Sequence, residues 1–592
     1  MQGKIPTKGA DRREFRGNPA SPGIVIGEAF VITTPMKEIP LKTIPETEIA
    51  REVSRFRKAL KKTRQNVLAS QKSITKKLGK ESGRIFDAHL LILEDDIVIE
   101  ETVKRIKNEQ VSADYAFFKT VSDYLFTLRE VNDDYLRERE ADIRDVKRRV
   151  ITNLKGIGDT SIPQLNKRVI LIAHELTPSM TAGLTRNKVI GVATDVSGRT
   201  SHAVIFARSL EIPSVVGLGD VTQYVNTGDR VILDGIAGVV INNPGEEEIE
   251  KYKEKVRQFR EFEEELSHIQ DLPAMTVDGY TVHLSANIEI PLEIKSVITH
   301  GAKGVGLFRT EFLFLDREDE PGEEEQYEIY SEVLKKLAPY PVVIRTFDLG
   351  GDKYINFLES PEEMNPYLGW RAIRISLECE SLFRTQLRAI LRSSVHGNLR
   401  VMFPMISCVE ELEQALDILK DEERKLREEG VEVDEGYETG IMIEIPAAAM
   451  IADILAKKVD FFSIGTNDLI QYAMAADRDN ARVAHLYQSF HPGVIRLVKK
   501  TIDAAKENGI WVATCGEMGG NPLGAVLLVG LGIDELSVSP AMAPEVKTII
   551  RAISLKDAQD IAASALKART QDEVMRILTG SLGDKMRELY IM

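Results

Sequence analysis

The stretch from Gly191 to Gly217, GVATDVSGRTSHAVIFARSLEIPSVVG, joins an apolar β-prone run to a polar turn and then to a segment with helical spacing. The turn delivers His202 directly before the apolar residues of AVIFARSL. A histidine on a Gly/Ser/Thr turn at a helix start lies beside free backbone N–H groups, which favour a bound anion. Its imidazole is a nucleophile that is substantially neutral near pH 7, so we predict that His202 accepts a transferable group. The alternative is a histidine that only caps the helix.

The letters around His202 resemble the phosphohistidine segment of the phosphoenolpyruvate-utilising enzymes. The family pattern is Gly-Gly-x-Thr-Ser-His, and this chain has SGRTSH at 197–202. Ser197 therefore replaces the first glycine, a difference that matters only if that position needs a positive φ. The resemblance implies that His202 accepts a phosphoryl group.

Size and composition predict a soluble multidomain protein. The chain has 592 residues, which suggests about three or four domains, with 43% hydrophobic and 29% charged residues. No run approaches the ~18 to 20 apolar residues of a membrane span. Residues 1–16 are basic and polar with no apolar h-region, so we expect a short mobile N-terminal extension rather than a secretory signal.

Net charge and cysteine spacing argue against several classes of partner and site. The net charge is −15 with no concentrated basic stripe, which argues against a nucleic-acid partner. The three cysteines, Cys379, Cys408 and Cys515, are far apart and have no CxxC spacing. This spacing argues against a disulfide framework and a zinc ribbon, and it favours a cytoplasmic protein.

A helical block is predicted at 36–154. From about Glu46 to Leu154 proline and glycine are almost absent and apolar residues recur at helical spacing. Breaks at Gly83, near 108–112 and at Asn132-Asp133 suggest roughly four helices in two antiparallel hairpins. Such a block is either a docking surface or a structural lid, and periodicity does not decide between them.

The regions on both sides of this block have α/β texture. Residues 17–35 read as a Gly/Pro turn and a strand, and 155–242 contain the β-rich runs VILIAHEL, KVIGVAT, IPSVVG and DRVILDGIAGVVIN. We therefore predict one α/β domain into which the helical block is inserted. Residues 243–273 are rich in Glu and Lys and predict an exposed linker helix.

The remainder, 274–592, alternates strand, loop and helix. Its strand candidates are VHLSANI, GVGLFR, PVVIRTFDL, LRVMFPMI, GIMIEI, FFSIG, WVATCG and ELSVS. Eight strands with intervening helical patterns predict a (β/α)8 TIM barrel, whose chemistry lies at the C-terminal ends of its strands.

Charged and polar residues gather at those predicted strand ends. They are Arg309, Arg345, Arg371, Glu444, Asn467, Asp468, Arg478 and Cys515. Any single arginine there could be a rim salt bridge worth ~0 to 1 kcal/mol. Four arginines facing two carboxylates instead indicate a polyanion with a hard divalent cation, for which Mg²⁺ is suited and Zn²⁺, lacking His or Cys ligands, is not.

These segments resemble the same family, and they match the phosphoenolpyruvate-binding barrel of Enzyme I of the bacterial phosphotransferase system. GVGLFRTEFLF, IRTFDLGGDK, NPYLGWRAIR, MIEIPAA, FFSIGTNDLIQY and CGEMGG carry this resemblance, which runs from about residue 20 to 545. It implies Mg²⁺ ligands Glu444 and Asp468. It also implies phosphoenolpyruvate contacts from Arg309, Arg345, Asn467 and Arg478, with Arg371 in support. Cys515 corresponds to the acid that protonates the enolate carbon.

The resemblance further implies a partner and an assembly. GRIFDAHLLILEDD (83–96) and ADIRDVKRR (141–149) match the surface that docks the phosphocarrier protein HPr. A homodimer through the barrel is also implied. We expect phosphoryl transfer from phosphoenolpyruvate to His202 and then to HPr, initiating the phosphorylation of sugars during uptake. The His202 domain would swing about the 243–273 helix.

Three rival hypotheses remain from the sequence. A nitrogen-related Enzyme I paralogue would typically carry an N-terminal sensory domain, whereas about 16 residues precede the match here. A dikinase-like phosphoenolpyruvate enzyme would need an ATP-grasp domain, for which we expect no room. A non-catalytic scaffold would have lost charge from the barrel mouth, yet every catalytic position is present.

Overall fold

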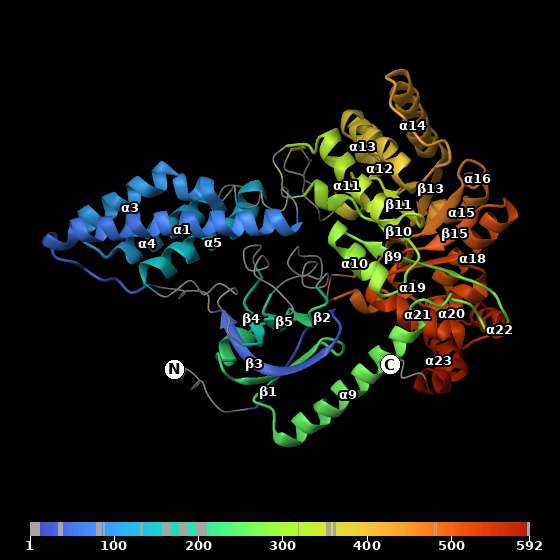
Figure 1. Ribbon diagram of the computed structural model, residues 1–592, viewed down its shortest axis with the longest axis horizontal. Coiled ribbons are helices and arrows are strands. Elements are labelled where there is room, and N and C mark those ends of the chain that lie inside the picture. The colour runs from blue at the N-terminus through green and yellow to red at the C-terminus, as the bar shows by residue number, and fades with distance from the viewer. Residues whose placement is uncertain are drawn as a thin grey trace. The chain divides into compact units, whose positions relative to one another are not determined.

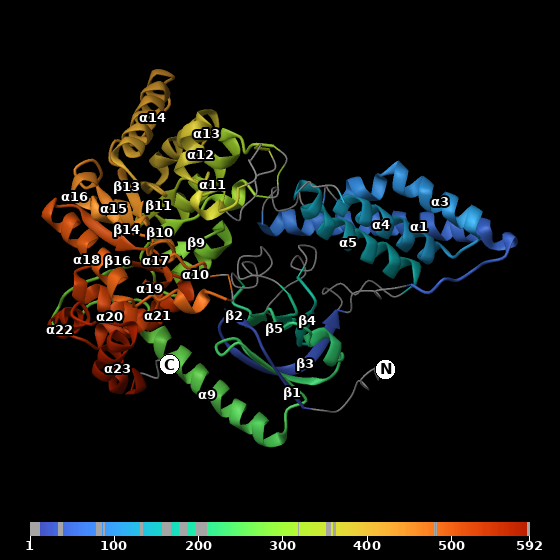
Figure 2. The same ribbon diagram turned by 180° about the vertical axis from the view of Figure 1, so that it is seen from behind.

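The protein divides into two compact units, Met1–Glu261 and Phe262–Met592. Figures 1 and 2 show opposite sides of the chain. This computed structural model describes residues 12–32, 39–78, 86, 89–130, 134–156, 167–176, 187–196, 210–315, 317, 319–350, 357–358, 363–478, 480 and 482–588. His202 and its turn lie outside the described residues. Within them, every cluster of buried apolar side chains belongs to one unit.

The first unit contains an eight-stranded mixed sheet in the order β1-β8-β7-β3-β4-β5-β6-β2. Its strands are β1 (Arg13–Arg16), β2 (Asn18–Ser21), β3 (Ile24–Ile32), β4 (Val169–Ala173), β5 (Val189–Thr194), β6 (Ser214–Val216), β7 (Arg230–Asp234) and β8 (Val239–Asn242). β3 through β6 are parallel, whereas the outer pairs are antiparallel. Because β3 pairs directly with β4, the helical residues between them are an insertion into one sheet.

The sheet begins earlier than the sequence analysis expected. Residues 13–16 were assigned to a mobile N-terminal extension, but they form β1, which pairs antiparallel with β8. Phe15 is buried and packs near Tyr224. The apolar ring of Phe15 fixes this edge strand, so that part of the expectation is wrong.

The inserted helical block has its own core. Its described helices are α1 (Ile49–Leu78), α3 (Asp96–Glu109), α4 (Ala113–Glu130) and α5 (Asp134–Leu154). Residues of α1 at three- and four-residue spacing, including Phe56, Ala59 and Val67, are buried in this core. The predicted break near 108–112 is present, since α3 ends before Gln110 in the left-handed conformation. Gly83 and Asn132-Asp133 lie outside the described residues.

The long helix α9 (Glu246–Ile269) lies inside the predicted linker range 243–273. Three glutamates in its first turn complement the positive end of the helix dipole. Ile249 and Tyr252 pack on β7 and β8 side chains. A four-residue helix, α8 (Val221–Tyr224), precedes β7. The boundary between the two compact units falls within α9, after Glu261.

The second unit is a closed barrel of eight parallel strands in the order β10-β11-β12-β13-β14-β15-β16-β9, and the predicted TIM barrel is confirmed. The strands are β9 (His283–Ile288), β10 (Val305–Phe308), β11 (Pro341–Arg345), β12 (Asn398–Phe403), β13 (Glu438–Ile443), β14 (Phe461–Ile464), β15 (Trp511–Thr514) and β16 (Glu535–Val538). Each corresponds to one of the eight runs identified in the sequence.

Helices surround these strands. They are α10 (Ile294–Thr299), α11 (Glu323–Leu337), α12 (Ile373–Glu378), α13 (Glu380–Ser393), α14 (Val409–Glu428), α15 (Pro446–Met450), α16 (Ala452–Leu455), α17 (Thr466–Met474), α18 (Pro492–Glu507), α19 (Glu517–Gly520), α20 (Pro522–Leu531), α21 (Ala543–Arg551), α22 (Leu555–Ala565) and α23 (Gln571–Glu588). No helix in the part of the chain that is described could span a membrane.

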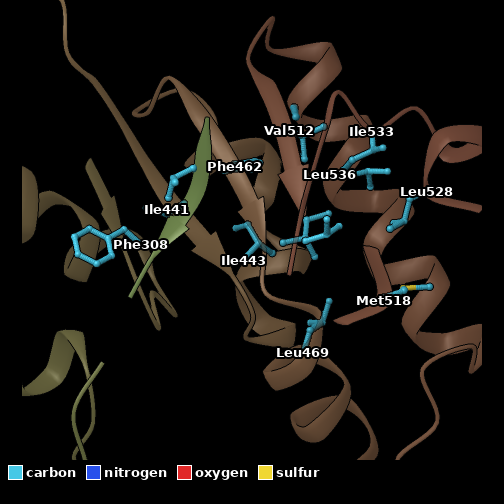
Figure 3. Close-up of a cluster of buried hydrophobic side chains, with 14 of the residues drawn as sticks. Phe308, Ile441, Ile443, Phe462, Leu469, Val512, Met518, Leu528, Ile533 and Leu536 are labelled. Carbon is cyan, nitrogen blue, oxygen red and sulfur yellow. The ribbon is translucent and has the colours of Figure 1, made fainter. Parts of the chain in front are cut away.

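Alternation along the strands separates two apolar layers. Side chains such as Ile441, Ile443 and Phe462 join the large core between strands and helices, and Figure 3 shows them in the same cluster as residues of α17, α19 and α20. The intervening Met442 and Phe461 belong to a smaller cluster inside the barrel. Because successive strand residues point to opposite faces, this register decides which residues at the strand ends face the barrel axis.

Candidate active site

Polar residues from several strands meet at the C-terminal end of the barrel, which we call the barrel mouth. Arg345 is the last residue of β11, and Glu444 and Cys515 directly follow β13 and β15. Each lies two residues after an inward-facing residue of its strand, namely Val343, Met442 and Ala513, so its side chain also faces the barrel axis. The same register that builds the core therefore directs a guanidinium, a carboxylate and a thiol to the axis.

Arg345 is buried with 5% exposure and is held by charge. Its Nη2 donates to Glu311 Oε1 at 2.9 Å, and its Nη1 lies 3.2 Å from Asp348 Oδ2. Burial alone would lower the pKa of Arg345, but Glu311 and Asp348 outweigh it and raise that pKa above the ordinary value. Arg345 therefore keeps its charge and its orientation in the closed mouth.

Arg371 shares one of these carboxylates. Its Nε and Nη2 donate to the two oxygens of Asp348 at 2.8 and 2.9 Å, a bidentate pair. Its Nη2 also donates to Asp468 Oδ2 at 3.2 Å, and its Nη1 to the Tyr472 hydroxyl at 3.1 Å. Asp348 thus fixes Arg345 and Arg371 relative to each other, which pre-organises two positive charges.

Glu444 is the exception in this cluster. It is 1% exposed, and its Oε1 accepts a hydrogen bond from the Met405 backbone N–H at 2.7 Å. Among the described residues it has no ion pair. Burial, followed by the negative charges of Asp468 and Asp348, raises the pKa of Glu444 well above its ordinary value despite two nearby arginines. A buried carboxylate in this condition favours a proton or a cation.

Two further arginines lie at the rim with their own partners. Arg309, which follows β10, forms an ion pair with Glu289 and its side chain is 34% exposed. Arg478 Nη1 lies 3.9 Å from Glu517 Oε1, and its side chain is 38% exposed. Asn467 Oδ1 accepts from the Glu517 backbone N–H at 3.0 Å, which connects the start of α17 to α19.

Cys515 lies at the top of the inward-facing apolar cluster, with 4% exposure. Burial raises the pKa of Cys515 to about 11, with Glu444 adding to the rise and a Ser463 hydrogen bond opposing it. The thiol donates weakly to Ile464 O at 3.8 Å. It is therefore protonated at neutral pH, as a proton donor must be.

A short hydrogen-bond chain holds the backbone of Cys515. Asn287 Nδ2 donates to Cys515 O at 2.9 Å, and Ser537 Oγ donates to Asn287 Oδ1 at 2.6 Å. Asn287 lies on β9 and Ser537 on β16, where the barrel closes. These hydrogen bonds link the end of β15, which precedes the thiol, to β9 and β16, the first and last strands of the barrel.

The structure thus brings together Arg345, Arg371, Glu444 and Asp468, and it places Arg309, Asn467, Arg478 and Cys515 around them. The sequence pattern assigned no role to the residues that orient this cluster, which are Asn287, Glu289, Glu311, Asp348 and Tyr472. Glu289 could have been found, because it directly follows a predicted strand. Tyr472 stands four residues after Asp468, a spacing that puts both on one helix face.

The donor set of the mouth fits a hard divalent cation. Among the described residues, six carboxylates accompany four guanidinium groups, and Glu444 is buried without an ion pair. Within the residues that are described, no group of three or more His, Cys, Asp or Glu forms a complete metal-ligand set. Mg²⁺ requires fewer protein ligands, since it keeps several waters and is often bound by one or two carboxylates.

The chain is similar in sequence to proteins of a known family. Family models match residues 16–139 (PEP-utilising enzyme, N-terminal), 165–238 (mobile domain) and 263–555 (PEP-binding domain). Phosphoenolpyruvate-protein phosphotransferases from Priestia megaterium and Listeria monocytogenes are 44% and 45% identical, each over 96% of this chain and 98% and 99% of their own length. A solution structure titled Enzyme I (nEIt) is 44% identical over 42% of this chain and 99% of its own, with a TM-score of 0.35. The chain belongs to the phosphoenolpyruvate-protein phosphotransferase family of PEP-utilising enzymes.

Proposed function

We propose that this protein transfers a phosphoryl group from phosphoenolpyruvate to His202 and then to a histidine of the carrier HPr, initiating sugar phosphorylation during uptake. One observation carries the proposal: two buried guanidinium groups, Arg345 and Arg371, share Asp348 beside a buried Glu444 that has no ion pair with any described residue. In such a site the carboxylate of Glu444 lacks a cation, while the two arginines present positive charge in fixed directions. A phosphorylated carboxylic acid that arrives with a divalent cation meets both conditions.

The arginines bind and orient the substrate. Arg345 and Arg478 contact the phosphate, and Arg309 and Asn467 contact the remaining phosphate or carboxylate oxygens, with Arg371 supporting Arg345. Because Glu311 and Asp348 already hold the buried guanidinium groups, little reorganisation is needed as charge develops on the moving group. Phosphoryl transfer depends mainly on such positioning and neutralisation.

Glu444 and Asp468 would hold Mg²⁺ in this site. When bound, Mg²⁺ neutralises the phosphate oxygens and supplies Lewis-acid stabilisation of the transferred group. Buried Glu444 and partly exposed Asp468 fit an oxygen-seeking cation and disfavour Zn²⁺, which prefers His and Cys. The buried Met405 N–H leaves one oxygen of Glu444 available for this role.

In the first transfer, a nitrogen of neutral His202 forms a bond to phosphorus as the phosphorus–oxygen bond to enolpyruvate breaks. The bonding electron pair leaves with the enolate oxygen. The Cys515 thiol then gives its proton to the enolate carbon, which yields pyruvate, and water restores the thiol. Since the pKa of Cys515 is raised to about 11, its proton is available at neutral pH.

The second transfer requires His202 to leave the barrel mouth and meet the carrier. We assign this motion to the 243–273 region, in which α9 lies. The carrier would dock on the helical block through 83–96 and 141–149. The proposal also includes a homodimer formed through the barrel unit, and action in the cytoplasm.

The direct test is incubation of the full chain with phosphoenolpyruvate labelled on phosphorus, with and without Mg²⁺. We expect one label per chain that is acid-labile, stable in alkali, dependent on Mg²⁺ and absent from His202→Ala. The labelled protein should pass its phosphate to HPr. Label that appears only with ATP, or that persists in His202→Ala, would contradict the proposal.

A further inference from the structure

A basic pocket lies on the helical block, and the proposed reaction does not use it. Its volume is about 380 Å³, within the usual range for small-molecule pockets. Helices α1 and α5 pack side by side (Figures 1 and 2). Side chains of both helices line the pocket. The residues that line it are Arg51, Ser54, Arg55, Lys58, Ala59, Lys62 and Asn153.

The spacing of the four cations places them on one face of α1. Arg51, Arg55, Lys58 and Lys62 are three or four residues apart, so they follow one another along the helix surface. The adjoining face, with Phe56, is buried in the core. The basic side chains therefore border the packed interface with α5 rather than spreading around the helix.

Arg55 forms the fixed part of the pocket. Its Nη1 donates to both oxygens of Glu52 at 2.6 and 2.7 Å, its Nη2 to Asp114 at 3.1 Å, and its Nε to Leu154 O at 3.3 Å. Arg55 therefore neutralises the C-terminal end of α5. The side chains of Arg51, Lys58 and Lys62 are not needed for that purpose, and they have no hydrogen bond or ion pair with any described residue.

Charge and polarity define what the pocket could take. Four cations with two carboxylates on Arg55 leave a local charge of about +2, in a chain whose net charge is −15. Asn153 Nδ2 donates to Thr63 Oγ1 at 2.8 Å, which fixes the amide, but its Oδ1 is buried without a hydrogen-bond partner among the described residues. A buried acceptor of this kind requires a donor.

We propose that this pocket binds a phosphate monoester of a small polyhydroxy compound. The phosphate dianion is held by Arg51, Lys58 and Lys62, which match its charge and supply free N–H donors. A hydroxyl group of the ligand donates to Asn153 Oδ1. Sulfate is a dianion without a proton to donate and leaves Asn153 unsatisfied, so the pocket distinguishes an organic phosphate from sulfate.

The test is calorimetric titration of the full chain with glycerol 3-phosphate and, separately, with sulfate. We expect saturable binding of glycerol 3-phosphate that weakens at least tenfold in Lys58→Gln/Lys62→Gln, since two charge-assisted hydrogen bonds are lost. The matched control is Arg57→Gln/Lys61→Gln, which removes two exposed cations of the same helix outside the pocket. Binding there should change less than twofold, and any binding at the barrel mouth is common to both variants.

Asn153→Ala separates the two ligand groups. It should weaken the binding of glycerol 3-phosphate and leave the binding of sulfate unchanged, with a thermal melt to show that the variant is folded. Equal losses in both lysine and control variants would overturn the proposal, because they indicate diffuse attraction. No saturable binding, or stronger competition by a hexaglutamate peptide than by glycerol 3-phosphate, would also overturn it.

Discussion

Both ends of the barrel carry arginine and glutamate side chains, but the two ends differ in whether each carboxylate has a cation partner. At the N-terminal end, which we call the barrel floor, Arg400 Nε lies 2.8 Å from Glu438 and its Nη1 3.5 Å from Glu535. The same guanidinium lies 4.2 Å from the ring centre of Trp511, which in turn stacks on Phe461 at 4.4 Å. Every carboxylate of this cluster therefore faces a cation.

At the barrel mouth, Arg345 and Arg371 are also paired, but buried Glu444 has only a backbone N–H donor among the residues that the structure describes. Burying an unpaired charge is expensive, so a structure keeps it only where a ligand compensates or where a proton neutralises it. The comparison teaches that arginine and glutamate at a barrel end do not by themselves mark a site. The site is marked instead by a buried carboxylate whose charge no cation compensates.

Replacing one glutamate by glutamine at each end of the barrel should give the largest difference between a role in catalysis and a role in stability. Glu444→Gln should lower phosphoenolpyruvate-dependent phosphorylation of His202 by about a thousandfold, because it removes the charge that would bind the cation. The free energy of unfolding without Mg²⁺ should stay the same or increase, since a neutral amide avoids the buried charge. Label incorporation and urea denaturation measure the two effects.

The matched variant at the floor is Glu535→Gln. It should change the phosphorylation rate less than twofold but lower the free energy of unfolding by about 1 to 3 kcal/mol, because it weakens a buried ion pair. Mg²⁺ should raise the Tm of wild type and Glu535→Gln but not of Glu444→Gln. If both variants lost activity equally, the distinction between the two ends would fail.

Cys515→Ala tests whether the Cys515 thiol at the barrel mouth acts as the general acid. It should slow release of pyruvate by about a hundredfold, because a general acid is lost, while the label on His202 still forms. Rapid-quench measurement of pyruvate and labelled protein separates these steps. Unchanged pyruvate formation would assign Cys515 to the apolar core alone.

The same residue predicts a pH effect on stability. Its folded pKa of about 11 lies above the ordinary thiol pKa of about 8.5. The stability that this buried thiol contributes is therefore full below about pH 8.5 and is lost as the pH rises through 11. Urea midpoints should fall more steeply with pH in wild type than in Cys515→Ala over this interval, and identical slopes would contradict the pKa.

Arg371→Lys sharpens the role of Asp348. A lysine cannot make the bidentate pair, so kcat/KM should fall about 10- to 100-fold while the fold is retained. Arg400→Lys at the floor should leave kcat/KM within twofold. A similar fall in kcat/KM for the floor variant would show that any disturbed barrel arginine slows the enzyme.

The smallest expected effect concerns Asn287. Asn287→Ala should lower kcat for pyruvate release about tenfold without changing KM, since it frees the Cys515 backbone but touches no substrate. Asn287→Asp should behave like Asn287→Ala, because an ionised carboxylate can accept from Ser537 but cannot donate to Cys515 O. A change in KM alone would assign Asn287 to binding instead.

Much of this protein follows from local sequence pattern. Period-two apolar runs between helical segments predict the eight barrel strands, and the residues after each run locate the mouth. The helical block between β3 and β4 follows from the absence of proline and glycine. These features depend on neighbours in the chain, so they are readable from its order.

What the tertiary structure alone decided is which charges meet. Asp348 joins Arg345 to Arg371, 26 residues further along the chain, and Asn287 reaches Cys515 only because β9 closes the barrel against β16. Burial of Glu444 and the strand formed by residues 13–16 are likewise consequences of packing. Pairing and desolvation depend on distances between remote segments, and no local spacing encodes them.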